Sequence, residues 1–165
     1  MFACGETVMH PTTGVCRILD IRNEKFSGSY QTYYVLQPVY DGANSKVFVP
    51  VESDKIVLRR LLDKAQINSI LAQVPSAQDL WSADERERNE RYAALLRSDD
   101  YAGIVKMIAQ LHIYRETLRE KGKKLHQSDE RLLAQAQTLI HQEFSFALGL
   151  PEAETIRYIM KRIAA

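Results

Sequence analysis

The first stretch of the chain has apolar and polar positions spaced as in short β-strands. Residues 7–9 form a β-favouring run that His10 and Pro11 interrupt, because proline lacks a backbone donor and fixes φ. Residues 12–14, Thr-Thr-Gly, supply a reversal, and residues 15–21 alternate apolar with polar side chains. The opening of the chain therefore predicts a hairpin that starts a small, strongly bent β-structure.

Three more short strands follow, rich in aromatic and β-branched side chains: residues 30–37, 46–51 and 56–59. Turns are predicted at residues 26–29 and at residues 41–44, where Asp-Gly favours an antiparallel hairpin. Pro50 places its strand, or the end of that strand, at a sheet edge, because proline cannot donate to a central ladder. About five short strands separated by turns predict a small antiparallel β-barrel.

Beyond residue 60 the apolar spacing changes to three or four residues, which is typical of amphipathic helices. Predicted helices, or apolar stripes within them, cover residues 64–71, 92–96, 104–115, 128–144 and 152–163. Pro75, Gly122 and Gly149 mark helix ends, and residues 98–100 and Ser128 supply helix caps. The pattern predicts an α+β fold with a β domain over residues 1–60 and an all-α domain over residues 61–165.

Composition is ordinary for a soluble globular protein, with 45% hydrophobic and 26% charged residues. The apolar runs are too short to span a bilayer, and no basic segment with a following apolar core suggests a signal peptide. We therefore expect a cytoplasmic protein without membrane contact. The formal net charge of +1 argues against binding nucleic acid by charge alone. Contact with DNA would need a local basic face or a partner that delivers the protein.

Residue types that catalyse reactions or bind metals are present but scattered. Cys4 and Cys16 lack nearby histidines and do not make a zinc site, so we expect buried or partly buried structural thiols. The four histidines fall in a turn or near separate predicted helices, without ligand spacing. No Ser-His-Asp arrangement, Gly-rich phosphate loop or paired-acid signature is present. We therefore expect no enzymatic activity, cofactor, metal or small-molecule substrate.

Four segments in a fixed order carry a family resemblance: FACGETVMHPTTGVCRI (2–18), YYVLQP (33–38), KVFVPV (46–51) and SDERLLAQAQTLIHQE (128–143). Together they resemble the CarD/CdnL family of bacterial transcription regulators. The N-terminal part also resembles the polymerase-interacting module of transcription-repair coupling factors. The resemblance implies a Tudor-like barrel that docks on the RNA polymerase β subunit. It also implies a helical domain that reaches promoter DNA and helps to keep the open complex open.

The resemblance implies that docking uses an exposed edge strand, whose unpaired backbone groups pair with a partner strand. Our candidate strand comprises Lys46, Val47, Phe48, Val49 and Pro50, because Pro50 already marks an edge. Glu24 and Phe48 stand where family members often have basic contact residues, so both depart from the family pattern. Phe48 either contacts the partner or packs inside the barrel.

Family members commonly carry a tryptophan that wedges into the minor groove at the bubble edge, where it stabilises unstacked DNA. The only tryptophan here is Trp81, and an ungapped count from the turn at residues 98–99 places Glu85 at the wedge position. Phosphates would repel an acidic residue there. Trp81 is therefore either the wedge on a shifted backbone or an anchor that packs one domain on the other.

Two basic groups are further candidates for DNA contact. Arg86, Arg88 and Arg91 lie near Trp81 but alternate with acidic residues, so a solvated helix with ion pairs within it is the competing interpretation. Lys121, Lys123 and Lys124 follow a predicted helix. They form either a phosphate-binding group or an ordinary basic helix cap.

The sequence thus predicts a transcription regulator that binds the polymerase β subunit through its barrel and modulates open-complex stability through its helical domain. Tethering to polymerase would raise the local concentration of the helical domain, so its contact with promoter DNA can be weak. The alternative is a polymerase-binding interaction module that does not touch DNA. Glu85 and the near-neutral charge favour that alternative.

Overall fold

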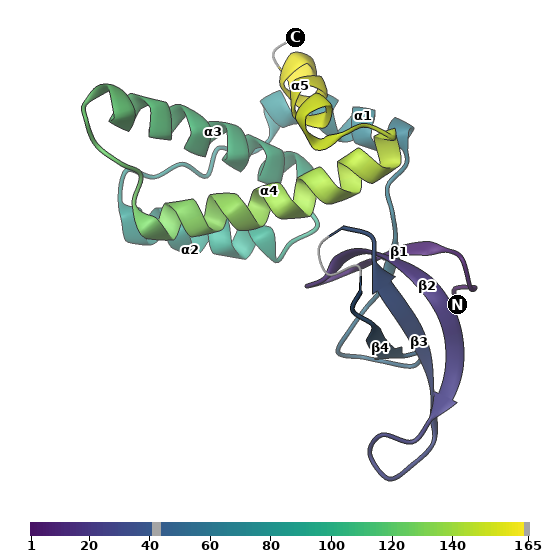
Figure 1. The fold of residues 1–165 in the computed structure, drawn as a ribbon. Coiled ribbons are helices and arrows are strands. Elements are labelled where there is room, and N and C mark those ends of the chain that lie inside the picture. Colours follow the sequence, from purple (N-terminus) through teal and green to yellow (C-terminus); the bar gives the residue numbers. More distant parts are fainter. Residues whose placement is uncertain (41–43, 164–165) are drawn as a thin grey trace. The chain divides into compact units, whose positions relative to one another are not determined.

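The chain divides into two compact units, Met1–Leu62 and Asp63–Ala165. The computed structural model describes residues 1–40 and 44–163. The first unit is built on one antiparallel sheet and the second on helices (Figure 1). The predicted α+β fold, with a β domain followed by a helical domain, is therefore confirmed.

The sheet has five strands in the order β4-β3-β2-β1-β5, so β4 and β5 are its two edges. The strands are β1 (Thr7–His10), β2 (Gly14–Glu24), β3 (Gln31–Pro38), β4 (Val47–Pro50) and β5 (Arg59–Arg60). All neighbours pair antiparallel. The strand that contains Pro50 lies at a sheet edge, as predicted.

His10 organises the tight turn between β1 and β2. Its Nδ1 atom accepts hydrogen bonds from the backbone N–H groups of Thr12 at 3.1 Å and Thr13 at 3.0 Å. Gly14 closes the turn with a φ of 89°, a left-handed value that glycine adopts at little cost. Burial lowers the pKa of His10, so its ring stays neutral and keeps this acceptor.

The β2–β3 hairpin is the longest part of the sheet, and its loop projects beyond the other strands (Figure 1). The register shifts between Ile18 and Asp20, where an extra residue forms a β-bulge and bends the strand. The predicted turn at residues 26–29 lies in this loop. The predicted turn at residues 41–44 lies, apart from Asn44, outside the described residues.

One face of the sheet carries the apolar core of the first unit. Its buried members are Val8, Cys16, Ile18, Tyr34, Leu36 and Val49. Burial raises the pKa of the Cys16 thiol to about 11, so Cys16 is the structural thiol that was predicted. The same prediction is wrong for Cys4, which is exposed because it lies in the turn before β1.

The last strand differs from its prediction. Only Arg59 and Arg60 pair with β1, opposite Met9 and Val8, so β5 begins three residues later than expected. Ile56 and Leu58 instead pack, partly buried, against the core of the sheet. The apolar side chains of this run are used for packing, and strand pairing starts only where the chain reaches β1.

The second unit contains α1 (Lys64–Gln73), the short 3-10 helix η1 (Val74–Ser76), α2 (Glu85–Leu96), α3 (Tyr101–Glu120), α4 (Gln127–Leu148) and α5 (Glu152–Ile163). Helices α3 and α4 form an antiparallel hairpin, α2 packs against both, and α1 contacts α5 (Figure 1). Within residues 1–40 and 44–163, none of the helices combines the length and hydropathy that crossing a bilayer requires.

Acidic side chains cap the first three α-helices of this unit: Asp63 on α1, Asp84 on α2 and Asp100 on α3. Helix α4 begins one residue before Ser128, so the cap predicted there is wrong. Its cap is His126, whose Nδ1 atom accepts from the Ser128 backbone N–H at 3.4 Å. Contacts of His126 and Ser128 with Glu85 of α2, at 2.9 and 3.1 Å, fix the first turn.

The core of the helical unit is formed by the apolar stripes that the sequence predicts. Its buried members include Ile104, Val105, Ile108 and Leu111 of α3 and Leu132, Leu133, Ala136, Ile140 and Phe144 of α4. Tyr92 of α2 completes the packing, and burial raises its pKa to about 12. Gly149 ends α4 with a φ of 66°, in the left-handed conformation expected of a helix stop.

Candidate functional site

Strand β4 presents unpaired backbone groups at one edge of the sheet. On its inner side, the Val51 N–H donates to the Thr32 carbonyl at 2.9 Å, and Val49 and Val47 pair with Tyr34 and Leu36. Because hydrogen-bonded and non-hydrogen-bonded pairs alternate in antiparallel ladders, the N–H and C=O groups of Phe48 point outward. Pro50 adds an outward carbonyl but no donor. Among the described residues no strand pairs with the outer side of β4, so the edge is open to one further strand.

The side chains of β4 alternate between two faces. Val47 and Val49 face the core of the unit, whereas Phe48 lies on the opposite face. There its ring lies 5.2 Å from the ring of Phe26 and 6.4 Å from that of Tyr33, between ring centroids. Phe48 therefore packs on Phe26 and Tyr33 outside the core, and its contact with a partner stays a prediction.

The other predicted polymerase contacts lie around this edge. Lys46 is exposed and immediately precedes β4. Glu24 is half-buried at the end of β2 and pairs in register with Gln31, so β3 separates it from β4. Sequence reasoning missed Phe26, whose place in a loop gave no signal of its contact with Phe48.

The loop before α2 holds Trp81 against α3 through several polar contacts. Lys106 donates to the carbonyl of Ala77 at 2.7 Å. The Asp79 carboxylate accepts from the Trp81 backbone N–H at 2.9 Å and from the Gln110 side chain at 2.7 Å. These two donors lower the pKa of Asp79. The loop is therefore fixed on the face of α3 that Lys106 and Gln110 share.

The Trp81 ring packs edge-on against Tyr114, with 4.8 Å between ring centroids. The guanidinium of Arg88 lies 5.0 Å from the Trp81 ring and 5.2 Å from the Tyr114 ring, within range for cation–π attraction. Trp81 and Tyr114 also line a shallow, mainly apolar hollow of about 210 Å³ together with Gln110, Ile113 and Thr117. These contacts of Trp81 belong to the helical unit itself.

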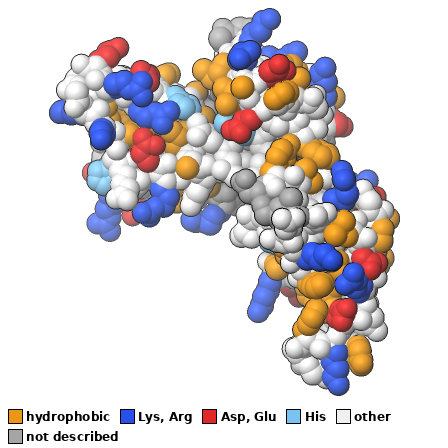
Figure 2. All heavy atoms as spheres, viewed as in Figure 1, with side chains coloured by type: hydrophobic (Ala, Val, Ile, Leu, Met, Phe, Trp, Pro, Cys, Tyr) orange, Lys and Arg blue, Asp and Glu red, His pale blue; other side chains and the backbone are white. Residues whose placement is uncertain are grey.

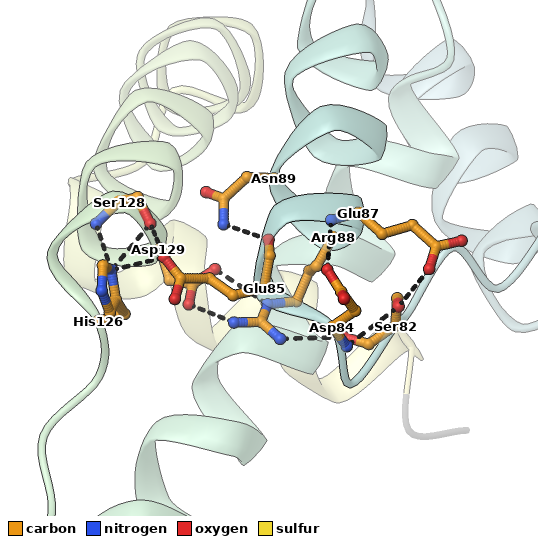
Figure 3. Close-up of polar contacts among 9 residues, drawn as sticks. All are labelled: Ser82, Asp84, Glu85, Glu87, Arg88, Asn89, His126, Ser128 and Asp129. Carbon is orange, nitrogen blue, oxygen red and sulfur yellow. Dashed lines mark hydrogen bonds and ion pairs between the residues drawn. The ribbon is translucent and has the colours of Figure 1, made fainter.

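Arg88 does not face solvent. Its side chain is only 2% exposed, and Nε and Nη2 donate to the two carboxylate oxygens of Asp129 at 3.0 and 2.6 Å. Nη1 donates to the carbonyl of Ser82 at 3.0 Å (Figure 3). Hydrogen bonding to Asp129 raises the pKa of Arg88 further. The expectation that Arg88 contacts DNA is corrected here, since its donors already bind groups inside the helical unit.

Ion pairs within α2 engage the other two arginines near Trp81. Arg86 is 91% exposed and lies 3.6 Å from Glu90 in an i,i+4 pair. Arg91 forms the same kind of pair with Glu87. Figure 2 shows Lys and Arg side chains interspersed with Asp and Glu on the visible face of the helices. These contacts support the solvated-helix interpretation of Arg86 and Arg91.

Lys121, Lys123 and Lys124 follow α3 as exposed residues. Gly122 has a φ of 72°, and the Lys123 N–H donates to the Leu118 carbonyl at 2.8 Å, which closes the helix end. In the part of the chain that the structure describes, these three side chains have no recorded ion pair. Their exposure is compatible with the predicted contact with a phosphate.

A small antiparallel sheet with an open edge and an exposed aromatic ring is typical of a protein-interaction domain. Residues 2–62 match the sequence model of the family described as CarD-like/TRCF RID domain. The first unit of this chain therefore carries a CarD-like/TRCF RID domain, which confirms the predicted resemblance over residues 2–62, and this domain type suggests an RNA polymerase-interacting module. The match ends before the helical unit. No curated protein matches the chain.

Proposed function

We propose that this protein binds the β subunit of bacterial RNA polymerase by adding a polymerase strand to β4. The observation that carries the proposal is the open edge of β4 in a domain of a polymerase-interacting family. A partner strand would satisfy the outward N–H and C=O groups of Phe48. Such a partner places the protein in the bacterial cytoplasm.

We further propose that the helical unit modulates the stability of the promoter open complex through weak contacts with DNA. The candidates are Trp81, Arg86, Arg91, Lys121, Lys123 and Lys124. Residues 63–165 contain 15 basic and 15 acidic residues, so long-range charge attraction is small. Tethering through β4 compensates, because a linked second site needs only modest intrinsic affinity.

The binding test measures the affinity of the full chain for the isolated β-subunit lobe and compares two substitutions of one residue. Phe48→Ala removes the ring and keeps the backbone donor, whereas Phe48→Pro also removes the outward N–H. Proline is tolerated at sheet edges, so both variants should fold. Phe48→Pro should bind several-fold more weakly than Phe48→Ala, as loss of one hydrogen bond of about 1 kcal/mol predicts. Equal affinities of the two variants would contradict strand addition at Phe48.

The second candidate function is a polymerase-binding module that does not touch DNA. Two observations favour it: the balanced charge of the helical unit, and Glu85, which holds the first turn of α4 and leaves no apolar wedge at that position. The double variant Lys123→Glu and Lys124→Glu discriminates between the two functions. It should shorten the open-complex lifetime and leave lobe binding intact if the helical unit contacts DNA.

The matched control for this double variant is Lys64→Glu with Lys161→Glu, which makes the same charge change at exposed positions of α1 and α5. This control should leave the open-complex lifetime near that of the unmodified protein. Equal lifetimes for both double variants and the unmodified protein would favour the module without DNA contact.

A further inference from the structure

Three aromatic side chains gather beside the open edge, on the face of the sheet opposite the core. Phe26, Tyr33 and Phe48 form a patch in which the ring centroid of Phe26 lies 5.0 Å from Tyr33 and 5.2 Å from Phe48. We call Phe26, Tyr33 and Phe48 the aromatic patch. Within the patch, Tyr33 is buried, whereas Phe26 is 59% exposed. An apolar ring this exposed gains free energy when a partner covers it.

Phe48 joins the aromatic patch to the open edge. Its backbone N–H and C=O are the groups that a partner strand would pair with, and its ring belongs to the patch. Paired residues in neighbouring strands place their side chains on the same face. The partner residue opposite Phe48 would therefore lie against the aromatic patch.

Several charged groups near the aromatic patch are engaged by neighbouring side chains. Arg22 pairs with Tyr33 in the β2–β3 register, and its Nε donates to Asp20 at 2.8 Å. This hydrogen bond lowers the pKa of the Asp20 carboxyl and raises that of Arg22. Lys25 lies over the ring of Tyr30, 5.6 Å from its centroid. Arg22 and Lys25 are therefore engaged, whereas Lys46, exposed immediately before β4, adds one positive charge beside the patch.

Building on the proposed function, we propose that the polymerase strand which pairs with β4 carries an aliphatic or aromatic side chain that packs on Phe26 and Phe48. Phe48 occupies a position where the family resemblance implies a basic residue. An apolar ring there requires an apolar partner residue opposite Phe48. Affinity should accordingly depend weakly on salt, because screening acts on charge and not on apolar burial.

The test measures binding of the isolated β-subunit lobe to the full chain and to Phe26→Ser. Phe26 is largely exposed in a loop, so this variant should fold. The matched control is Tyr30→Ser, because Tyr30 is an aromatic residue of the same loop, 69% exposed and outside the patch. We expect Phe26→Ser to weaken binding about tenfold, as loss of roughly 1.4 kcal/mol of ring burial implies, and Tyr30→Ser to have little effect.

The same titrations at about 0.05 M and about 0.5 M salt separate apolar from ionic contact, because the Debye length falls several-fold across this range. A change of less than about threefold in affinity supports the proposal, whereas ionic contacts would lose far more. If the full chain binds the lobe but Phe26→Ser binds equally well, the proposed apolar contact is contradicted. A steep fall of binding with salt would contradict it too. In both cases the proposal of strand addition at β4 is unaffected.

Two other outcomes overturn the proposal. If the unmodified chain does not bind the lobe at all, the proposed function fails together with the apolar contact. If sedimentation reveals a dimer that Phe26→Ser dissociates, and the lobe does not compete with that dimer, the aromatic patch belongs to a second copy of the chain.

Discussion

The two units present their candidate contact residues in opposite ways. In the β unit, the outward backbone groups of the β4 edge have no strand partner within residues 1–40 and 44–62, and Phe26 beside this edge is exposed. In the helical unit, Arg88 is buried on Asp129, and Trp81 packs against Tyr114 in a loop tied to α3. The residues of the first arrangement are exposed at a sheet edge, whereas those of the second make their contacts within the helical unit.

The difference shows that a basic or aromatic residue in the sequence does not by itself indicate a side chain that is free to contact a partner. Arg86, Arg88 and Arg91 look alike in the sequence, yet Arg88 is buried and the other two form surface ion pairs. A contact surface needs donors and rings that the fold has not already used. By that measure β4 and the lysines after α3 are stronger candidates than the arginines of α2.

The largest expected effect is the loss of the buried ion pair. Arg88→Ala leaves the Asp129 carboxylate buried without its partner, which should lower the free energy of unfolding of the helical unit by about 3–5 kcal/mol. Trp81 is the only tryptophan, so its fluorescence during denaturation reports on this unit. The control is Arg86→Ala, which removes an exposed arginine of the same helix and should leave stability nearly unchanged.

The same Arg88→Ala variant also tests whether the units are independent. In a Cys4→Ser background, the buried Cys16 thiol reacts with a thiol reagent only when the β unit opens. We expect the Cys16 thiol to react at the same rate with and without the Arg88→Ala substitution, because Arg88 and Asp129 both lie in the helical unit. A faster reaction of Cys16 in the Arg88→Ala variant would mean that the two units unfold together. That result would contradict the description of two independent units.

A smaller effect is expected from Gln110→Ala. Gln110 donates to Asp79 and accepts from the Tyr92 hydroxyl at 2.8 Å, so its removal leaves the buried Tyr92 hydroxyl and the Trp81 loop without a shared partner. We expect a loss of about 1–2 kcal/mol in unfolding free energy. Time-resolved anisotropy of Trp81 should show faster local motion. Unchanged anisotropy would contradict the role of Gln110 in holding the loop.

The smallest effect is a pH dependence of stability that differs between the units. Burial lowers the pKa of His112 and His141 in the helical unit and of His10 in the β unit below the ordinary 6.5. The unfolded chain therefore binds more protons than the folded chain between the lowered pKa values and pH 6.5. Stability is fully present above about pH 6.5 and falls as pH decreases through this window.

The helical unit should lose more stability than the β unit, because it contains two such histidines and the β unit one. Glu152 lies 3.5 Å from His141 and opposes the lowering of its pKa, so Glu152→Gln should increase the loss at acid pH. Denaturation followed by Trp81 fluorescence and by Cys16 reactivity at about pH 7.5 and about pH 5.5 separates the two units. Equal losses of unfolding free energy in the two units would contradict the expected difference in their pH dependence.

Much of the architecture followed from local patterns. Alternation and turn residues located four of the five strands, and helical spacing located the core stripes of α3 and α4. Asp100 caps α3 within the predicted turn, and Gly149 ends α4 where expected. These signals suffice because a turn, a cap or a stripe involves residues only a few positions apart.

Two signals in the sequence were available but not decisive. Val47, Val49 and Val51 alternate with Phe48, which already places its ring on the face opposite these valines. Arg88 stands four and seven residues before Tyr92 and Leu95, on the buried stripe of α2. Each pattern indicated the face of the residue but not what it would contact.

The sequence by itself determined the order of strands and helices, the edge position of β4 and the family of the first unit. Only the tertiary structure decided that Arg88 binds Asp129, 41 residues away, and that the loop residue Phe26 covers Phe48. The reason is physical: local patterns report which face of an element is apolar, whereas pairing between distant side chains depends on how those faces meet. The open β4 edge remained the candidate interface, and the aromatic patch beside it emerged only in three dimensions.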